Sequence, residues 1–159
     1  MNKFIKVIIF SLLICVSTAC SYDPIFSMKD NYEFKIEGIT LNGDKEINSI
    51  IKRNLNMVKT DNESYKKKYY INVNTTKEKK IISKDSEGDP STFEISITTI
   101  YEILDNQKLL LNRKFENKNI YNNESDKFKL EQSEKIIIEN LSEKISDTII
   151  SSITNLNDN

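Results

Sequence analysis

The side chain with the most specific chemistry in this 159-residue sequence is the thiol of Cys20. Lys3 and Lys6 precede an apolar run at residues 7–16, and the small residues 17–19 stand directly before the cysteine. An apolar run of this length is too short to cross a bilayer, which takes roughly 20 residues. A positive start, a short apolar segment and small residues before a cleavage position are typical of a secretory signal peptide. Because bacterial lipoproteins are modified on a cysteine at the first position after cleavage, the pattern predicts lipid on Cys20.

The predicted modification places a diacylglyceryl group on the Cys20 sulfur and an acyl chain such as palmitate on the new amine. The sequence departs from the usual lipoprotein cleavage pattern at Ser17, where an aliphatic residue is common. The alternative is therefore an ordinary signal peptide cut at Ala19. Cys15 does not compete, because Ile14 is too bulky for the cleavage position. We therefore predict a signal peptide at 1–19, a lipidated tether at 20–31 and a single α+β domain at 32–159.

The rest of the chain is poor in residues that carry out catalysis. It has no His, no Trp and only three Gly, and Cys20 would be its only cysteine after cleavage. These absences exclude Ser-His-Asp and Cys-His mechanisms, His-containing zinc sites and an intramolecular disulfide. Asp and Glu are frequent, but they stand among Lys and Asn on what we interpret as solvated faces. The composition predicts a protein that is not an enzyme and carries no metal or cofactor.

The charge of the chain argues against nucleic acid as its partner. Loss of the two signal-peptide lysines takes the formal net charge from −1 to −3, with both signs mixed along the sequence. Nucleic-acid binding would instead require a basic surface. No later apolar run is long enough to span a membrane, so lipid on Cys20 is the only anchor that we predict.

The spacing of apolar residues predicts the elements of the first half of the domain. Alternation through Tyr32, Phe34 and Ile36 predicts a strand, which Gly38 and a turn at Asn42-Gly43 close. Asp44 then caps a helix, and a charged loop follows at 60–68. The apolar side of that helix recurs at steps of three and four: Ile47, Ile50, Ile51, Leu55 and Val58.

Three more strands and a second helix follow. Alternation predicts strands at 69–76 (extending as far as Ile82), at 93–103 and at 109–115, with a turn at Asp105-Asn106 that pairs the last two. The Asn-rich segment 117–126 is predicted to lead out of the sheet. The final helix carries an apolar stripe that starts at or after Phe128: Ile138, Leu141, Ile145, Ile149, Ile153 and Leu156.

The predicted order is therefore strand, helix, three strands, helix. We expect an α+β two-layer sandwich, with a four-stranded, mainly antiparallel sheet and two helices on one face. Ile100, Leu104 and Leu110 fall on the opposite face, which a partner would cover if they form a patch. The alternative is that they are scattered surface aliphatics.

With these elements in place, the sequence resembles the lipopolysaccharide-assembly lipoprotein LptE in its alphaproteobacterial form. The resemblance rests on a lipidated cysteine with a Pro-containing lead, Cys20-Ser21-Tyr22-Asp23-Pro24-Ile25-Phe26. It rests also on the βαβββα order and on the segment Tyr121-Asn122-Asn123-Glu124-Ser125 before the last helix. The resemblance implies a plug within the outer-membrane β-barrel LptD of Gram-negative bacteria, where the two deliver lipopolysaccharide to the outer leaflet. It also implies an outer-membrane location, lipid-anchored on the periplasmic side or in the barrel lumen.

Binding of lipopolysaccharide would require Lys or Arg near an apolar edge, because the ligand carries phosphates and acyl chains. The candidates are Lys77, Lys79, Lys80 and Lys84 around the connection between the second and third strands, and Arg113 and Lys114 on the fourth. The alternative is a solvated charge run. Two other functions stay open: a periplasm-facing module that binds a peptidoglycan synthase or transport complex, and a surface-exposed ligand-binding lipoprotein.

Overall fold

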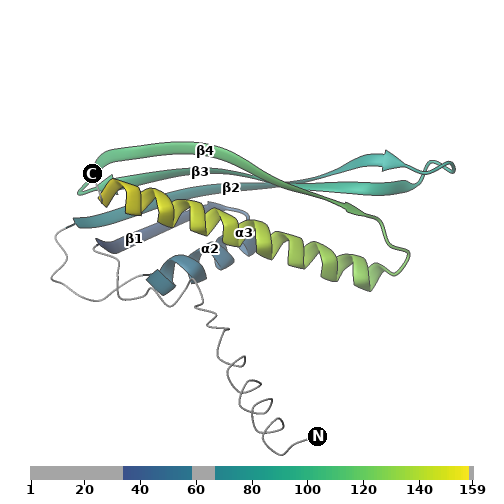
Figure 1. The fold of residues 1–159 in the computed structure, drawn as a ribbon, viewed down its shortest axis with the longest axis horizontal. Coiled ribbons are helices and arrows are strands. Elements are labelled where there is room, and N and C mark those ends of the chain that lie inside the picture. The colour runs from purple at the N-terminus through teal and green to yellow at the C-terminus, as the bar shows by residue number, and fades with distance from the viewer. Residues whose placement is uncertain (1–33, 59–66, 158–159) are drawn as a thin grey trace, which may run out of the picture. The chain divides into compact units, whose positions relative to one another are not determined.

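The computed structural model of the protein describes residues 34–58 and 67–157 (Figure 1). The predicted signal peptide, Cys20 and the tether lie outside these residues. The described chain forms four strands and two helices in the order β1, α2, β2, β3, β4, α3. Their bounds are Phe34–Gly43 for β1, Lys45–Val58 for α2, Lys67–Lys84 for β2, Pro90–Asp105 for β3, Lys108–Asn122 for β4 and Lys127–Asn157 for α3.

The strands form one sheet in the order β1-β2-β3-β4. The pair β1–β2, which α2 connects, is parallel, and the pairs β2–β3 and β3–β4 are antiparallel. This confirms the predicted α+β fold and its mainly antiparallel sheet. Strand β1 pairs with β2 only as far as Gly43 and Thr75. Strand β2 therefore continues beyond β1 as one arm of a long hairpin with β3.

Both helices start at aspartates that accept hydrogen bonds from free amides of the first turn. Asp44 Oδ1 accepts from the amides of Glu46 (3.0 Å) and Ile47 (3.1 Å), as predicted. Asp126 Oδ1 accepts from the amides of Phe128 (3.1 Å) and Lys129 (3.3 Å) at the start of α3.

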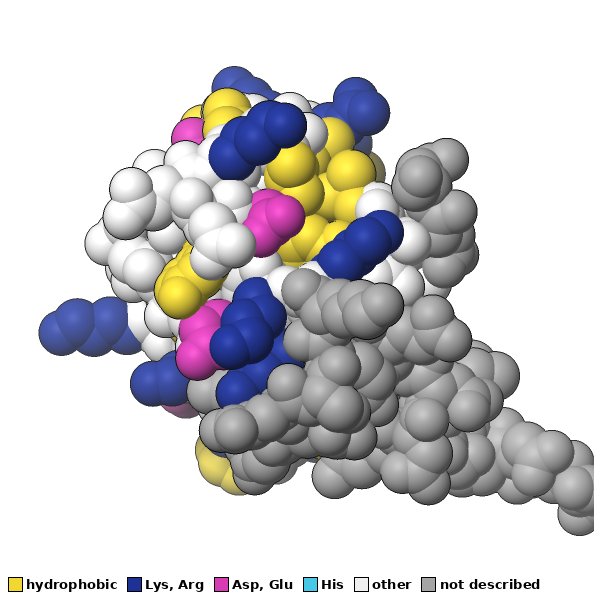
Figure 2. Space-filling model, turned by 90° about the vertical axis from the view of Figure 1, so that its left-hand side faces the viewer, with side chains coloured by type: hydrophobic (Ala, Val, Ile, Leu, Met, Phe, Trp, Pro, Cys, Tyr) yellow, Lys and Arg dark blue, Asp and Glu magenta, His cyan; other side chains and the backbone are white. Residues whose placement is uncertain are grey.

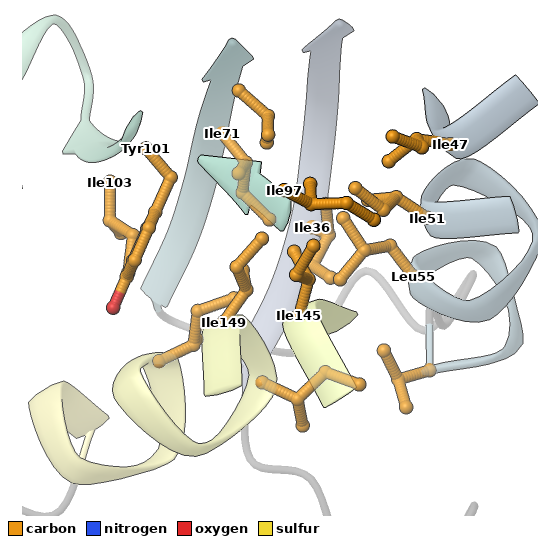
Figure 3. Packing of buried hydrophobic residues seen from close by; sticks show 14 of the residues in the cluster. Ile36, Ile47, Ile51, Leu55, Ile71, Ile97, Tyr101, Ile103, Ile145 and Ile149 are labelled. Carbon is orange, nitrogen blue, oxygen red and sulfur yellow. The ribbon is translucent and has the colours of Figure 1, made fainter. Parts of the chain in front are cut away.

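The two helices cover the same face of the sheet and share one core with it (Figure 3). Ile47, Ile51 and Leu55 of α2 and Ile145 and Ile149 of α3 point towards the sheet and are fully buried. The sheet contributes fully or almost fully buried residues from three strands: Phe34, Ile36, Tyr69, Ile71, Val73, Ile95, Ile97, Tyr101 and Ile103. The apolar stripes predicted for both helices are thus the surfaces that close the core.

Several predicted boundaries were wrong. Strand β1 continues past Gly38 to Gly43. A bulge at Glu37 shifts the register just before the glycine, and the pairing with β2 then resumes. Lys67 and Lys68, predicted as loop, are the first residues of β2. The hairpin turn is centred on Asn106 and Gln107, both with positive φ (43° and 74°), one residue later than predicted.

The largest error concerns the Asn-rich segment. Residues 117–122 continue β4 in register with β3, pairing Asn117 with Ile97 and Tyr121 with Phe93. Asn is a poor strand former by itself, but here β3 supplies a complete hydrogen-bonding partner, and tertiary pairing overrides the propensity. Phe128 lies in the first turn of α3, in line with the prediction, but it is 68% exposed, and the buried part of the helix begins at Leu130.

Candidate interaction surfaces

The first candidate surface is the distal hairpin, which we define as residues 79–93. Figure 1 shows it extending past the N-terminal end of α3. All residues from 76 to 89 are exposed. At its tip, Asp85 Oδ1 accepts hydrogen bonds from the amides of Glu87 (3.0 Å) and Asp89 (2.9 Å), and Gly88 adopts φ +92°. The tip therefore holds its shape through local hydrogen bonds without help from the core.

The hairpin is fastened to α3 by a cluster built around Lys79. The Lys79 ammonium lies 4.3 Å from the centre of the Phe93 ring and 5.9 Å from that of Tyr121, within the range of cation–π attraction. It also forms an ion pair with Glu134 of α3. The Tyr121 hydroxyl donates to the same Glu134 oxygen at 2.8 Å, and the two rings stack at 5.7 Å. We call Lys79, Phe93, Tyr121 and Glu134 the latch.

Burial of the Tyr121 ring raises the pKa of its hydroxyl, and the hydrogen bond to Glu134 and the charge of that carboxylate raise it further. Each of these three causes disfavours a phenolate, so Tyr121 stays a hydrogen-bond donor at neutral pH. The latch therefore places the Lys79 cation opposite the Glu134 carboxylate and over the ring of Phe93, with the Tyr121 ring nearby. This cation is already engaged within the fold, unlike a charge held ready for a ligand.

The structure does not bring the predicted basic residues together at one site. Lys79 lies on the helix side of the sheet, whereas Lys80 lies on the opposite side and pairs with Glu78 at 3.1 Å. Its hydrogen bond to Glu78, and then the charge of that residue, raise the pKa of Lys80. Lys84 ends β2 at the tip of the hairpin, opposite Pro90.

Arg113 and Lys114 also face opposite sides of the sheet. Arg113 lies opposite the buried Tyr101 in the strand register. Together with Ser152 and Leu156 of α3, it lines a small hollow of about 210 Å³. Lys114 pairs with Ile100 on the side away from the helices. In the strand register, Lys80 lies opposite Glu94 of β3 and Lys114 lies opposite Ile100. These two β3 positions are six residues apart, so the backbones of Lys80 and Lys114 are roughly 20 Å apart along the strand direction. Lys77, also a candidate, pairs with Asp44 and Glu46 at the start of α2.

Exposed aliphatic side chains on and beside the distal hairpin complete this surface. Ile81 is 51% exposed, Ile82 49%, and Ile120 on the neighbouring β4 is 57% exposed. Alternation could have identified Ile81 and Ile82, since two consecutive apolar residues in a strand must occupy opposite faces. Ile120 could not be found in this way, because the sequence pattern placed its segment outside the sheet.

The second candidate surface is the face of the sheet opposite the helices, which we call the open face. Ile100 (39% exposed) and the half-buried Leu104 lie on it, as predicted. The prediction for Leu110 was wrong, because a bulge at this position turns its side chain towards the core, and Leu109, 51% exposed, pairs with Leu104 instead. Tyr70, 41% exposed, flanks Leu104 on the other side.

The middle of the open face is polar. The Glu102 carboxylate accepts hydrogen bonds from the side-chain amides of Asn72 (3.3 Å) and Asn112 (3.2 Å) on the two flanking strands. A hollow of about 420 Å³ adjoins this group, lined by Tyr70, Asn72, Leu104, Asn106 and Gln107. Beyond it, a hollow of about 360 Å³ reaches from Asn72 to Ile100. Figure 2 shows the end of the fold away from the hairpin, where hydrophobic side chains form a group bordered by both basic and acidic side chains.

Within residues 34–58 and 67–157, no three His, Cys, Asp or Glu side chains are grouped so that they could hold a metal ion. Neither α2 nor α3 is long and apolar enough to cross a membrane.

The sequence matches no protein-family model and no curated protein. The fold, by contrast, is similar to solved structures of bacterial lipoproteins. Rare lipoprotein B from Shewanella oneidensis superposes with a TM-score of 0.53 at 15% identity, over 76% of this chain and 98% of that chain. An uncharacterized lipoprotein B from Nitrosomonas europaea gives 0.60 at 15% identity, over 79% and 88%.

A minor lipoprotein from Acinetobacter baumannii gives a TM-score of 0.51 at 16% identity, over 75% of this chain and 94% of that chain. The described domain thus has the fold of these rare and minor lipoproteins. At these identities the similarity establishes the fold alone.

Proposed function

We propose that this chain is an LptE-type lipoprotein, anchored in the outer membrane through lipid on Cys20, that plugs the LptD barrel and assists delivery of lipopolysaccharide. The observation that carries the proposal is the fold, which matches almost the full length of rare lipoprotein B, a name for LptE. The predicted signal peptide at 1–19, cut directly before Cys20, supports it independently of the structure. The role is that of a non-enzymatic assembly partner.

The open face gives a physical reason for a protein partner. The helices of the domain cover one face of its sheet. A plug in a barrel with a polar lumen would therefore contact the barrel through the other face, which needs both polar and apolar side chains. On the open face, Lys80 pairs with Glu78 and Lys118 with Glu94 (3.6 Å), between aliphatic side chains at either end. Such a surface can be exposed to water when the protein is alone, and it can also contact the polar inner wall of a barrel.

Within this proposal, the distal hairpin is the part suited to lipopolysaccharide. Lys80 and Lys84 flank the exposed Ile81 and Ile82, which combines cations for phosphates with aliphatic surface for acyl chains. Lys79 is a weaker candidate, because the latch engages it. Arg113 and Lys114 are remote from the hairpin and would require a second contact.

The test is affinity purification of the tagged full-length lipoprotein from membranes in mild detergent. We expect a large outer-membrane β-barrel to copurify, and loss of the gene to deplete lipopolysaccharide from the cell surface. A peptidoglycan synthase in place of the barrel, with normal surface lipopolysaccharide in the deletion strain, would establish the interaction-module alternative.

Charge reversal at the hairpin tests the lipopolysaccharide contact separately. Lys80→Glu with Lys84→Glu should weaken binding of lipopolysaccharide without unfolding, because the new carboxylates repel its phosphates. The matched control reverses two exposed lysines on the helices, Lys52 and Lys144, so that net charge changes equally. Equal losses in the two double variants would show a net-charge effect and remove the hairpin from the proposal. Lys79→Glu is kept out, because it would set two carboxylates against each other in the latch.

Mass spectrometry of the mature N-terminus tests the anchor. We expect cleavage before Cys20 and three acyl chains on it, since each buried methylene contributes about 0.8 kcal/mol and two chains suffice for stable attachment. Cys20→Ser should release the protein from the membrane fraction. An unmodified Cys20, or a serine variant that still sediments with membranes, would contradict the prediction.

A further inference from the structure

The open face carries an aromatic side chain in an unusual setting. The ring of Tyr70 leans across β1 onto Gly38, where a Cβ would lie 2.9 Å from Tyr70 Cδ1 and 3.3 Å from Cε1. Any other residue at position 38 would therefore push the ring away. The glycine lets the ring rest on the sheet while 41% of the side chain stays exposed. Tyr70 thus offers solvent an aromatic surface that the sheet supports from below.

Next to this ring, polar groups are held in fixed directions. Asn72 and Asn112 each donate one amide hydrogen to Glu102, which orients both carboxamides and the carboxylate across three neighbouring strands. Each Asn keeps a second amide hydrogen and its carbonyl oxygen, and the carboxylate keeps further lone pairs. The group therefore presents alternating donors and acceptors at the open face.

From this juxtaposition we propose that the open face holds a binding site for a neutral saccharide. The apolar C–H face of a sugar ring would stack on Tyr70, and its neighbouring hydroxyls would exchange hydrogen bonds with Asn72, Glu102 and Asn112. The two hollows, of about 420 and 360 Å³, are both in the range of small-molecule sites and share Asn72. Together they offer room for more than one sugar unit along the strands.

The charge of the site selects the ligand class. Among the described residues that line the two hollows, Glu102 is the only charged one. An anionic group would meet this carboxylate with no cation among those residues to offset it. A purely aliphatic chain would leave the oriented amides without hydrogen-bond partners, which costs free energy. A neutral polyhydroxyl ligand satisfies both conditions.

The inference rests on this face alone. A saccharide bound there would occupy part of the surface that the proposed function assigns to the barrel wall, so the two proposals are tested separately. The same chemistry would accept sugars from lipopolysaccharide or from the glycan of the cell wall, and the experiment separates the two. The first probe is a neutral oligosaccharide from the outer core of lipopolysaccharide, free of lipid, phosphate and acidic sugars. The second is chitotriose, a neutral oligomer of the N-acetylglucosamine that occurs in cell-wall glycan.

Binding is measured by saturation-transfer NMR titration of the full-length mature protein in detergent. We expect one of the two saccharides to bind, with transfer strongest to protons that contact an aromatic ring. Tyr70→Leu, which keeps an apolar contact on Gly38, should weaken binding about tenfold, and Asn112→Ala by a similar factor. Gly38→Ala should weaken it as well, because the new Cβ displaces the ring while Tyr70 itself is retained.

The matched control is Ile136→Ala, a 58% exposed position on α3 outside both candidate surfaces, which should leave affinity unchanged. Thermal melts identify any variant that loses its fold, and the remaining variants then decide. Three results would overturn the site. They are that neither saccharide binds the protein, that Tyr70→Leu and Asn112→Ala leave the affinity unchanged, or that equimolar inorganic phosphate displaces the sugar. Preference for chitotriose would keep the site while favouring a cell-wall ligand. The barrel pull-down remains the separate test of the LptD proposal.

Discussion

The base of the sheet and the distal hairpin are built from the same two strands, yet different forces hold them. At the base, β2 and β3 bury Ile71, Ile97 and Ile103 completely beneath two helices. Along the hairpin, β2 is exposed throughout, and the latch contributes one ion pair, one hydrogen bond, stacked rings and the cation–π contacts of Lys79. The buried core therefore stabilises the domain, whereas the latch fixes the orientation of the distal hairpin.

The energies of these two regions should differ accordingly. Full burial of an aliphatic side chain contributes about 1.5–3 kcal/mol, whereas exposed ion pairs contribute about 0–1 kcal/mol. The Lys79 side chain is 41% exposed, which puts its ion pair near the weak end of the range. Loss of the latch should therefore release the hairpin and the start of α3 without unfolding the base.

The largest expected effect is in the core. Ile97→Ala and Leu141→Ala should each lower the free energy of unfolding by about 2–5 kcal/mol, because each removes buried methyl groups and leaves a cavity. Ile97 is fully buried and Leu141 is 7% exposed, so Ile97 should lie higher in the range. Urea denaturation measures both, with the exposed Lys135→Ala expected within about 0.5 kcal/mol as the control. Equal stability of all three variants would refute the packing.

Two glycines allow a matched test of base against hairpin. Gly43 and Gly88 both have positive φ (+99° and +92°), where an L side chain costs about 1–3 kcal/mol. A Cβ on Gly43 would also lie 1.9 Å from the backbone oxygen of Thr75, whereas one on Gly88 meets nothing within 4 Å. Gly43→Ala should therefore destabilise clearly more than Gly88→Ala in thermal melts. Equal shifts would mean that backbone conformation alone matters at Gly43.

The smallest effect is expected at the latch. Tyr121→Phe keeps the ring and removes the hydrogen bond to Glu134, which should cost about 0.5–1.5 kcal/mol. Amide hydrogen exchange should show the loss mainly in residues 79–93 and the first turns of α3, with the core unaffected. Faster exchange spread evenly over the whole sheet would show that the latch and the base form a single cooperative unit.

The latch also predicts a pH dependence. The pKa of Tyr121 is raised in the folded state, first by burial and then by Glu134, above the value of about 10 expected when it is unfolded. Above that pH the unfolded chain loses a proton that the folded chain keeps, so the contribution present below pH 10 declines as pH rises. Urea denaturation between pH 8 and 11 should show a smaller decline for Tyr121→Phe than for the natural protein. Identical declines would contradict the raised pKa.

The sequence was sufficient for the order of elements and for most of the core. Ile47, Ile51 and Leu55 follow helical spacing and are all buried, and alternation identified Ile95, Ile97 and Ile103. In these segments the local pattern and the tertiary contacts agree. The errors at Gly38 and at 117–122 fall where a neighbouring strand decides the conformation, which no local pattern can reveal.

The candidate surfaces were harder to predict for the same reason. That Lys79 and Lys80 point to opposite sides follows from alternation, but the engagement of Lys79 depends on Glu134, which is 55 residues away in the chain. The group of Asn72, Glu102 and Asn112 lies on three strands and appears only when their register is known. Three dispersed polar residues give no sequence signal of their own.

The two-residue turn at Asn106 and Gln107 has a consequence for how the domain assembles. It joins β3 to β4 with the shortest closure in the sheet, and hairpins of this kind form in about 1–10 μs. The parallel pair β1–β2 must instead wait for the segment between them, including α2, to be arranged, and non-local pairings are slow. We therefore expect the hairpin β3–β4 to form early and the pairing of β1 with β2 to form late. Pulsed hydrogen exchange during refolding should protect the amides of β3 and β4 first; earlier protection of β1 would reverse this order.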